Sequence, residues 1–319
     1  AEDGIRDIHC SLVGSEMCIR DRITIFHWGV HGWAFYVATA LAIGLYSHRH
    51  GRPLTMRTAL TPLLGDHLER WPGLGVDTIA LFGTVCGVAT SIGLAASSMN
   101  ATLSDLTGLA VGLPQQIGIV LTVCAFGVVS ALSGVSRGIR WLSEWNVWIS
   151  GLLLVIIASL GPTAFLGALL VQTAADYAWT VLPTGAWLAS SPEDQAWQAD
   201  WTVFYWAWWL AWTPFVSLFV ARISKGRTVR EFVLAVLVVP TCVIVIWMTV
   251  FGGTALHQEL AQAGALSAAV AEDTSLGLVA MIGNLGVPAL QPAIVAVAAF
   301  LLFSWLVTSL DSATLVICH

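Results

Sequence analysis

The sequence predicts an all-α polytopic membrane protein. Hydrophobic residues make up 57% of the 319 residues and charged residues only 10%, whereas soluble domains carry about a quarter charged residues. The mean hydropathy is +0.81. Apolar runs of about the 20 residues that a helix needs to span a bilayer recur along almost the whole chain. This pattern leaves no room for a separate soluble domain.

Seven of these runs are predicted to be membrane-spanning helices. They lie at 23–47, 75–97, 115–135, 143–162, 200–221, 231–252 and 289–313. Two of the intervening segments are also expected to be helical. Residues 163–186 are moderately apolar and end near Pro183, so we expect a helix along the outer membrane interface. Residues 55–70 are expected to form a similar short helix on the inner side.

The first 22 residues differ from the rest of the chain. AEDGIRD is acidic and is not followed by the apolar region of a signal peptide. The next stretch, IHCSLVGSEMCIRDR, resembles translated sequencing adapter at the end of an assembled contig. We therefore expect 1–22 to be non-native and 23–319 to be one transmembrane domain. The apolar run that stops at His319 suggests a fragment cut at both ends.

Positive charges occupy alternate loops. Ten of the 13 Lys and Arg residues lie in 48–74, 136–142 and 222–230, and the loops between them carry acidic residues instead. Cytoplasmic loops are enriched in Lys and Arg, so these three segments are predicted to face the cytoplasm. The first and seventh spans then run from outside to inside. The net charge of −6 reflects mainly the outer loops, and we expect no nucleic-acid partner.

The fifth span is unusually aromatic. FYWAWWLAWTPF, residues 204–215, holds four tryptophans, a tyrosine and two phenylalanines. At about 100° per residue, seven aromatic side chains fall on one stripe of this helix. They are Trp201, Phe204, Tyr205, Trp208, Trp212, Phe215 and Phe219. Trp209 lies at the edge of the stripe and Trp206 roughly opposite.

Two ordinary explanations account for only part of this stripe. An interfacial aromatic belt suits Trp201 and Trp206, but Trp208 and Trp212 lie near the middle of the span. Tight packing is the other explanation, although helix interfaces in membranes favour small residues. We favour a ligand site, because a quaternary ammonium group donates no hydrogen bond and is held best by the faces of aromatic rings. Pro214 should bend this helix.

Four stretches resemble the betaine/choline/carnitine transporters (BCCT), in the same order. They are FHWGVHGWAFY, SGVSRGIRWLSEWN, WTVFYWAWWLAWTPFVSLFVARISKGRTVREF and VTSLDSATLV. The resemblance covers 23–319 and implies the fourth to tenth of twelve helices. It implies a LeuT-like inverted-repeat transporter fold with the substrate near the bilayer midplane. This chain is then incomplete at both ends and lacks the first helix of the first repeat.

The resemblance also implies a function. We expect a secondary active transporter that imports glycine betaine, choline or carnitine by alternating access, as a homotrimer in a bacterial inner (plasma) membrane. It would need no cofactor beyond a coupling ion. A non-transporting membrane sensor is the alternative. A membrane-embedded enzyme is a weaker one, supported only by a G-x-S-x-G match at 134–138 and by His27 and His31.

The site residues follow from the same resemblance. An aromatic box is implied, formed by Trp28, Trp33, Tyr36, Trp208, Trp209 and Trp212. Phe204, Phe215 and Phe219 resemble the flanking and gating aromatics. Trp305 occupies a position where the family often has phenylalanine, and it is a further candidate for the wall.

The coupling ion is less clearly indicated. Thr308 and Ser309 match one sodium site of the family, and Thr84 matches a ligand of another. Val88 stands where sodium-coupled members have a second threonine, so that site lacks an oxygen. Thr84 has an alternative role as a hydroxyl bonded back to its own helix. Asp311 is a carboxylate inside a span, either functional or satisfied by neighbouring Ser and Thr. We expect at most one Na⁺, and slightly favour H⁺.

Overall fold

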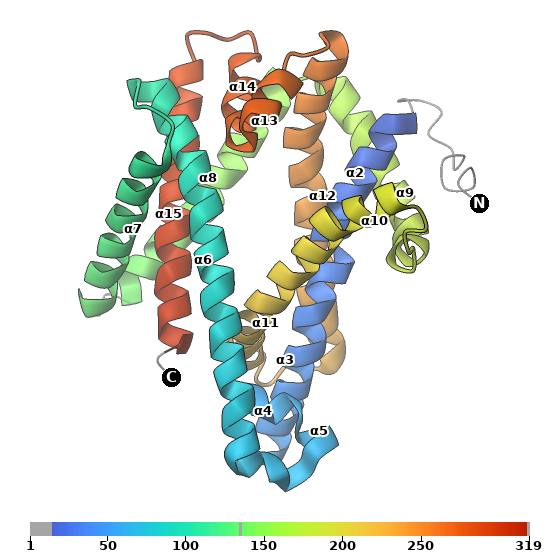
Figure 1. Cartoon of the computed structure of the whole chain (residues 1–319), viewed down its shortest axis with the longest axis vertical. Helices are drawn as coiled ribbons and strands as arrows, with labels where there is room; N and C mark the ends of the chain where they lie inside the picture. Colours follow the sequence, from blue (N-terminus) through green and yellow to red (C-terminus); the bar gives the residue numbers. More distant parts are fainter. Residues whose placement is uncertain (1–14, 134–135, 318–319) are drawn as a thin grey trace. The chain divides into compact units, whose positions relative to one another are not determined.

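The computed structural model describes residues 15–133 and 136–317, and the regular elements within them are helices (Figure 1). The long helices are α2 (Ser15–Trp28), α3 (Val30–His50), α6 (Trp71–Thr107), α7 (Leu113–Ser133), α8 (Ser136–Leu160), α9 (Thr163–Gly185), α11 (Phe204–Ile223), α12 (Val229–Ala261) and α15 (Gln291–Ile317). The short ones are α4 (Met56–Ala59), α5 (Thr61–Leu64), α10 (Pro192–Gln198), α13 (Ser267–Glu272) and α14 (Gly277–Gly283). The predicted all-α class is confirmed. Most of the segment 1–22 and part of the motif at 134–138 lie outside the described residues.

Among the described residues, seven helical segments are long and apolar enough to cross a membrane. They include six of the predicted spans together with α9, which was predicted to lie along the interface. The remaining predicted span corresponds to α7, whose residues Leu113–Val129 form a shorter apolar helix. Two helices, α6 and α12, extend well beyond the predicted spans. The placement of α9 along the membrane surface stays a prediction.

The chain divides into two compact units. The first contains residues up to Val88, Val171–Met248 and the last few residues, and the second contains Ala89–Leu170 and Thr249–Leu315. Each unit has its own core.

The core of the first unit is the contact between α3 and α11. Side chains of α3 such as Ala40 and Ile43 pack against Val220 and Ala221 of α11, and all four are buried. The backbones approach closely: a Cβ on Gly32 would lie 2.3 Å from the ring of Trp209. Small residues at a helix contact are typical of membrane proteins, where association depends on close packing because lipid is as apolar as the side chains.

The core of the second unit gathers around α15. Its buried residues contact α8, α12 and α14 on one side, and its C-terminal half contacts α6 and α7. A buried polar pair joins two of these helices, because the hydroxyl of Ser304 on α15 donates to Asn146 Oδ1 on α8 at 2.7 Å. Each partner satisfies the other, which lowers the cost of burying polar atoms in an apolar core.

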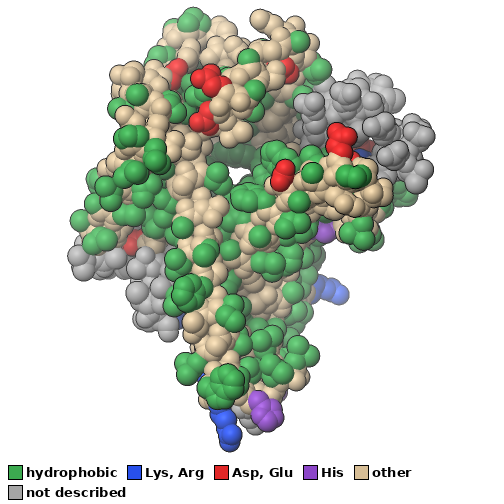
Figure 2. Space-filling view, in the orientation of Figure 1, with side chains coloured by type: hydrophobic (Ala, Val, Ile, Leu, Met, Phe, Trp, Pro, Cys, Tyr) green, Lys and Arg blue, Asp and Glu red, His purple; other side chains and the backbone are tan. Residues whose placement is uncertain are grey.

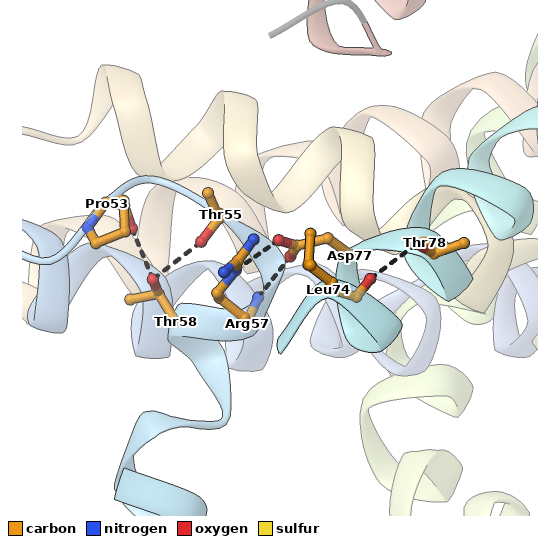
Figure 3. Close-up of polar contacts among 7 residues, drawn as sticks. All are labelled: Pro53, Thr55, Arg57, Thr58, Leu74, Asp77 and Thr78. Carbon is orange, nitrogen blue, oxygen red and sulfur yellow. Dashed lines mark hydrogen bonds and ion pairs between the residues drawn. The ribbon is translucent and has the colours of Figure 1, made fainter. Parts of the chain in front are cut away.

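The loop between α3 and α6 is not the single helix predicted for 55–70. It forms α4, α5 and a 3₁₀ turn at Gly65–Glu69. Pro62 has no N–H with which to continue the helix, and Gly65 adopts φ of 56°. The loop is fastened to α6, because Arg57 Nε lies 2.6 Å from Asp77 Oδ2 and the Arg57 amide donates to Oδ1 at 3.0 Å (Figure 3).

The surface of the helices is largely hydrophobic (Figure 2). On α6, for example, Ile79 is 74% exposed and Phe82 67% exposed. Patches of this kind are rare on soluble monomers and are expected where side chains face lipid. In the first unit, acidic side chains are visible near α10 and basic ones near α4 and α5 (Figure 2). The orientation of the chain in the membrane stays a prediction.

Candidate functional site

The aromatic residues of α2, α3 and α11 meet in one cluster within the first unit. The ring of Trp209 lies at the centre, with centroid distances of 5.0 Å to Tyr36, 5.7 Å to Trp33 and 5.9 Å to Trp28. Trp28 also contacts Trp208 at 5.4 Å, edge to face. These are the separations and angles that aromatic pairs prefer. Five of the six residues predicted for the box are therefore linked by ring contacts into one cluster.

Trp212, the sixth residue, lies one turn beyond Trp208 on α11. Its ring contacts Phe215 at 5.5 Å. It also faces α6, where a Cβ on Gly87 would lie 3.2 Å from Trp212 Cδ1. The lack of a side chain at Gly87 therefore lets the backbone of α6 approach this indole.

The two sides of α11 have different roles. Trp209, Thr213, Ser217 and Val220 follow one another at helical spacing and are buried, so this side faces α3. Trp208 lies about 100° around the helix from Trp209, and is only partly buried. The side of α11 that is buried against α3 therefore lies next to the predicted aromatic stripe and meets it only at its edge, at Trp209.

Trp206 lies opposite the stripe, as expected. An interfacial belt does not fully account for it, because its ring also packs against other helices. Its ring contacts Phe26 at 5.2 Å, Phe35 at 5.8 Å and His31 at 6.2 Å. It therefore packs on the other side of the same helix pair. A substitution at Trp206 would disturb the packing of α2 and α3, so this residue is a poor control for the site.

The first predicted span is interrupted at Gly29, between α2 and α3. Two backbone groups beside the break are satisfied by side chains. The amide of Val30 donates to the phenol oxygen of Tyr177 at 2.8 Å, and the carbonyl of His27 accepts from Trp209 Nε1 at 2.8 Å. Buried backbone groups require such partners in an apolar medium. Trp209 is thus both part of the aromatic cluster and a partner of the broken helix.

The two histidines of this region, His27 and His31, pack against neighbouring helices. His27 is buried, its Nε2 lies 3.0 Å from Thr202 Oγ1, and its ring stacks on Tyr205 at 4.8 Å. His31 lies against the end of α9, where a Cβ on Gly185 would be 2.3 Å from His31 Nε2.

The flanking aromatics are more exposed than the cluster. Phe204 contacts Trp208 at 5.9 Å and is 41% exposed, and Phe219 is 50% exposed. Phe215 contacts Trp212. Pro214 lies within α11, which continues through it to Ile223. The gating role of these residues stays a prediction.

The predicted ion ligands fall in both units. In the first, Thr84 is buried and its hydroxyl donates to the Ala80 carbonyl at 3.0 Å, which is the back-bonded arrangement considered as its alternative role. In the second, the hydroxyl of Thr308 donates to the Ser304 carbonyl at 2.9 Å. Ser309 is exposed and Asp311 is buried.

The second unit also holds Trp305, the remaining candidate for the wall, which is 38% exposed. Because this residue belongs to a different unit from the aromatic cluster, its part in a shared site stays a prediction.

Sequence reasoning missed Tyr177 and Thr202 as neighbours of the site. Tyr177 lies 147 residues from Val30 along the chain, and Thr202 lies 175 residues from His27. No local pattern marks either residue. Gly29, the first of the two glycines in FHWGVHGW, is the one local signal that a break was available at that point.

Comparisons with known proteins identify the family of this chain. The sequence profile of the betaine/carnitine/choline family of transporters (BCCT) matches residues 21–319. Glycine betaine transporter 1 of Vibrio parahaemolyticus is 41% identical over 297 residues, which are 92% of this chain and 55% of that protein. Glycine betaine transporter OpuD of Bacillus subtilis is 36% identical over 297 residues, 93% of this chain and 57% of that protein.

A further relative carries a different substrate name. An osmo-dependent choline transporter of Acinetobacter baylyi is 40% identical over 239 residues, 74% of this chain and 34% of that protein. The chain spans about half the length of the first two relatives. These relatives are bacterial and are named as transporters rather than enzymes.

The apolar helices and the bacterial relatives together identify a multi-pass bacterial membrane protein. The profile covers the chain from residue 21 to its end, and it includes every residue of the aromatic cluster on α2, α3 and α11. The chain therefore belongs to the betaine/carnitine/choline family of transporters.

Proposed function

We propose that this chain forms the substrate-binding part of a transporter that moves a quaternary-ammonium solute, such as glycine betaine or choline, across the bacterial plasma membrane. The observation that carries the proposal is the cluster around Trp209. Trp28 of α2, Trp33 and Tyr36 of α3 and Trp208 of α11 contribute rings, with centroids 5.0 to 5.9 Å apart in the contacts that link them through Trp209 and Trp28.

The charge of these helices supports a quaternary cation over a primary amine. Neither α3 nor α11 contains Asp or Glu. A primary ammonium buried there would need acceptors for its N–H groups. A quaternary ammonium has no such groups, and each desolvated ring face contributes about 2 kcal/mol to holding it. Rings without carboxylates therefore suit a permanently charged, methylated amine.

The relatives support the same class of substrate. Their names include glycine betaine and choline, and carnitine appears in the name of the family. The transport cycle that we propose is alternating access, in which two inverted repeats expose a midplane site to each side in turn.

The coupling ion is proposed to be at most one Na⁺, with H⁺ slightly favoured. Val88 has no oxygen where sodium-coupled members of the family have threonine, and this weakens the site that includes Thr84. Thr308 and Ser309 keep a second sodium site plausible. Their hydroxyls lie on α15 within one turn, and oxygen ligands of this kind suit a hard cation.

The homotrimer expected from the family is also proposed, with α9 at the contact. This helix has two opposite sides. Thr173, Tyr177 and Thr180 are buried on one side, whereas large apolar side chains are exposed on the other. The exposed ones are Val171 at 71%, Trp179 at 78% and Leu182 at 79%. An apolar surface of this kind fits contact with lipid or with a second copy.

Transport by the full-length protein in proteoliposomes tests the proposal. Labelled glycine betaine and choline should accumulate, and glycine, which carries a primary ammonium, should not compete. Binding of the methylated amines without accumulation would favour the sensor alternative. If neither methylated amine binds, the proposed substrate class is wrong.

A further inference from the structure

The buried side of α9 meets the break between α2 and α3. Tyr177 is 6% exposed, and Thr173 and Thr180, which precede and follow it at helical spacing, are each 3% exposed. Gly185, eight residues after Tyr177, lies against His31. One side of α9 is thus fitted to the segment that carries Trp28, although α9 contributes no ring to the aromatic cluster.

The contact at Gly29 is close and specific. Val30 is the first residue of α3, and its amide donates to Tyr177 Oη at 2.8 Å. A Cβ on Gly29 would lie 2.5 Å from the same oxygen, 2.9 Å from Cζ of Tyr177 and 2.6 Å from the Ile25 carbonyl oxygen. Only glycine therefore allows the phenol to reach the backbone here. The first turn of α3 is otherwise regular, since the Trp33 amide donates to the Gly29 carbonyl at 3.2 Å.

The hydrogen bond from Val30 favours the broken form of the helix over a continuous one. In a continuous helix, the Val30 amide would donate to the carbonyl of Phe26, four residues earlier. That bond requires no partner from elsewhere. In the broken form, the amide depends on Tyr177, because an apolar surrounding offers no water to replace a lost acceptor.

The break fixes the position of Trp28, which directly precedes Gly29. Its ring contacts Tyr205 at 5.6 Å, Trp208 at 5.4 Å and Trp209 at 5.9 Å. Restoring a continuous helix would change the backbone direction at Gly29 and with it the orientation of this indole relative to α11. The geometry of the cluster therefore depends on the backbone conformation that Tyr177 stabilises.

We propose that Tyr177 is a positioning residue of the substrate site: its phenol oxygen caps α3 at Val30 and so holds Trp28 against α11. The inference rests on the proposed function, because the site that it positions is the one proposed there. The bond from Trp209 to the His27 carbonyl supports the same break from the other helix. Unlike Trp209, Tyr177 contributes no ring to the aromatic cluster.

Tyr177→Phe tests this role, because it removes one oxygen and leaves the ring. Without its acceptor, the broken form should lose about fivefold to tenfold in population relative to the continuous one. When only the broken form binds, the apparent affinity for substrate falls with the fraction of protein in that form, so fivefold to tenfold is the largest loss that this change can cause. We expect the KM for glycine betaine or choline to rise, by up to about tenfold, and the maximal rate at equal expression to change less than twofold.

Tyr46→Phe is the matched control, since it makes the same chemical change near the end of α3, away from the break. Its KM should equal that of the unmodified protein. Hydrogen exchange gives a readout that is independent of transport. Peptides that contain Val30 should exchange slowly in the unmodified protein and faster in Tyr177→Phe, with no change in Tyr46→Phe.

Each outcome decides the proposal. An unchanged KM together with unchanged exchange in Tyr177→Phe would overturn it, as would fast exchange of Val30 in the unmodified protein. If Tyr177→Phe does not fold, Gly29→Ala serves instead, with Gly93→Ala as its control because a Cβ there meets nothing within 4 Å. Gly29→Ala should raise KM, and an unchanged KM would refute the positioning role.

Failure of the proposed function would look different. In that case the unmodified protein would neither bind nor accumulate a methylated amine, whereas exchange at Val30 would still report on the cap. Conversely, if Trp208→Leu weakens substrate binding and Tyr177→Phe has no effect, the substrate site stands and the positioning role does not.

Discussion

Replacing Trp208 by leucine should weaken binding of a quaternary-ammonium substrate while leaving the fold intact. Trp208 is only partly buried, and it contacts Trp28, Phe204 and Tyr205 through its ring. Trp209 would be a less informative choice, because its indole N–H also supports the break at His27. A change there would mix the loss of a ring face with the loss of a backbone contact.

The magnitude follows from the contacts of this ring. A desolvated cation–π contact contributes about 1–2 kcal/mol, and a tenfold change in affinity corresponds to about 1.4 kcal/mol. The substrate affinity of Trp208→Leu should therefore fall by about fivefold to thirtyfold. The protein also loses the edge-to-face pair with Trp28, which is worth about 0.5–1.5 kcal/mol of stability. That loss is small enough for the variant to remain folded.

Competition by unlabelled glycine betaine and choline against a labelled substrate measures the effect, in full-length protein at a fixed membrane potential. Trp148→Leu is the control, because Trp148 is 77% exposed on α8 and belongs to the second unit. It should leave the affinity unchanged within about twofold. Equal losses in both variants, or no loss at Trp208, would refute the assignment of the aromatic cluster as the substrate site.

Three further predictions follow from the described contacts. Gly32→Ala should displace the ring of Trp209, because the new Cβ would lie 2.3 Å from it. The cost should be about 1–3 kcal/mol of stability, and an unchanged melting temperature would contradict this packing. Asp77→Asn should remove the ion pair with Arg57 and speed proteolysis of the loop between α3 and α6. At most about 1 kcal/mol of stability should be lost, because the pair is partly exposed, and unaltered cleavage would show that the pair does not fasten the loop. Uptake by the protein should depend on sodium with a Hill coefficient of about one or less, and Val88→Thr should strengthen that dependence; a coefficient near two without the substitution would mean that both sodium sites work.

Much of the fold was predictable because membrane helices are local structures. In an apolar medium each backbone amide must find a partner, and a helix supplies it four residues away. The length of an apolar run therefore predicts most of a span, as for α11 and α15, and the distribution of Lys and Arg predicts its direction. The stripe formed by Trp208 and Trp212 needed only helical periodicity.

The extent of some helices was less predictable. Hydropathy predicted spans at 75–97 and 231–252, but α6 and α12 continue beyond both, because polar residues can remain helical next to an apolar run. The segment 55–70 has helical composition yet forms short turns, because Pro62 removes an amide and Gly65 adopts a positive φ. In both cases the local backbone chemistry, rather than the apolar content, decides where a helix begins and ends.

The sequence by itself determined that the protein is a helical membrane protein of this family and that indoles gather on α11. The tertiary structure alone decided which side of α11 faces α3, that Trp206 packs on the same helix pair, and that the first span breaks at Gly29. The physical reason is the source of each hydrogen bond. Continuous helices satisfy their backbone from within, whereas a broken one depends on side chains such as Tyr177 and Trp209, which are remote in sequence and marked by no local pattern.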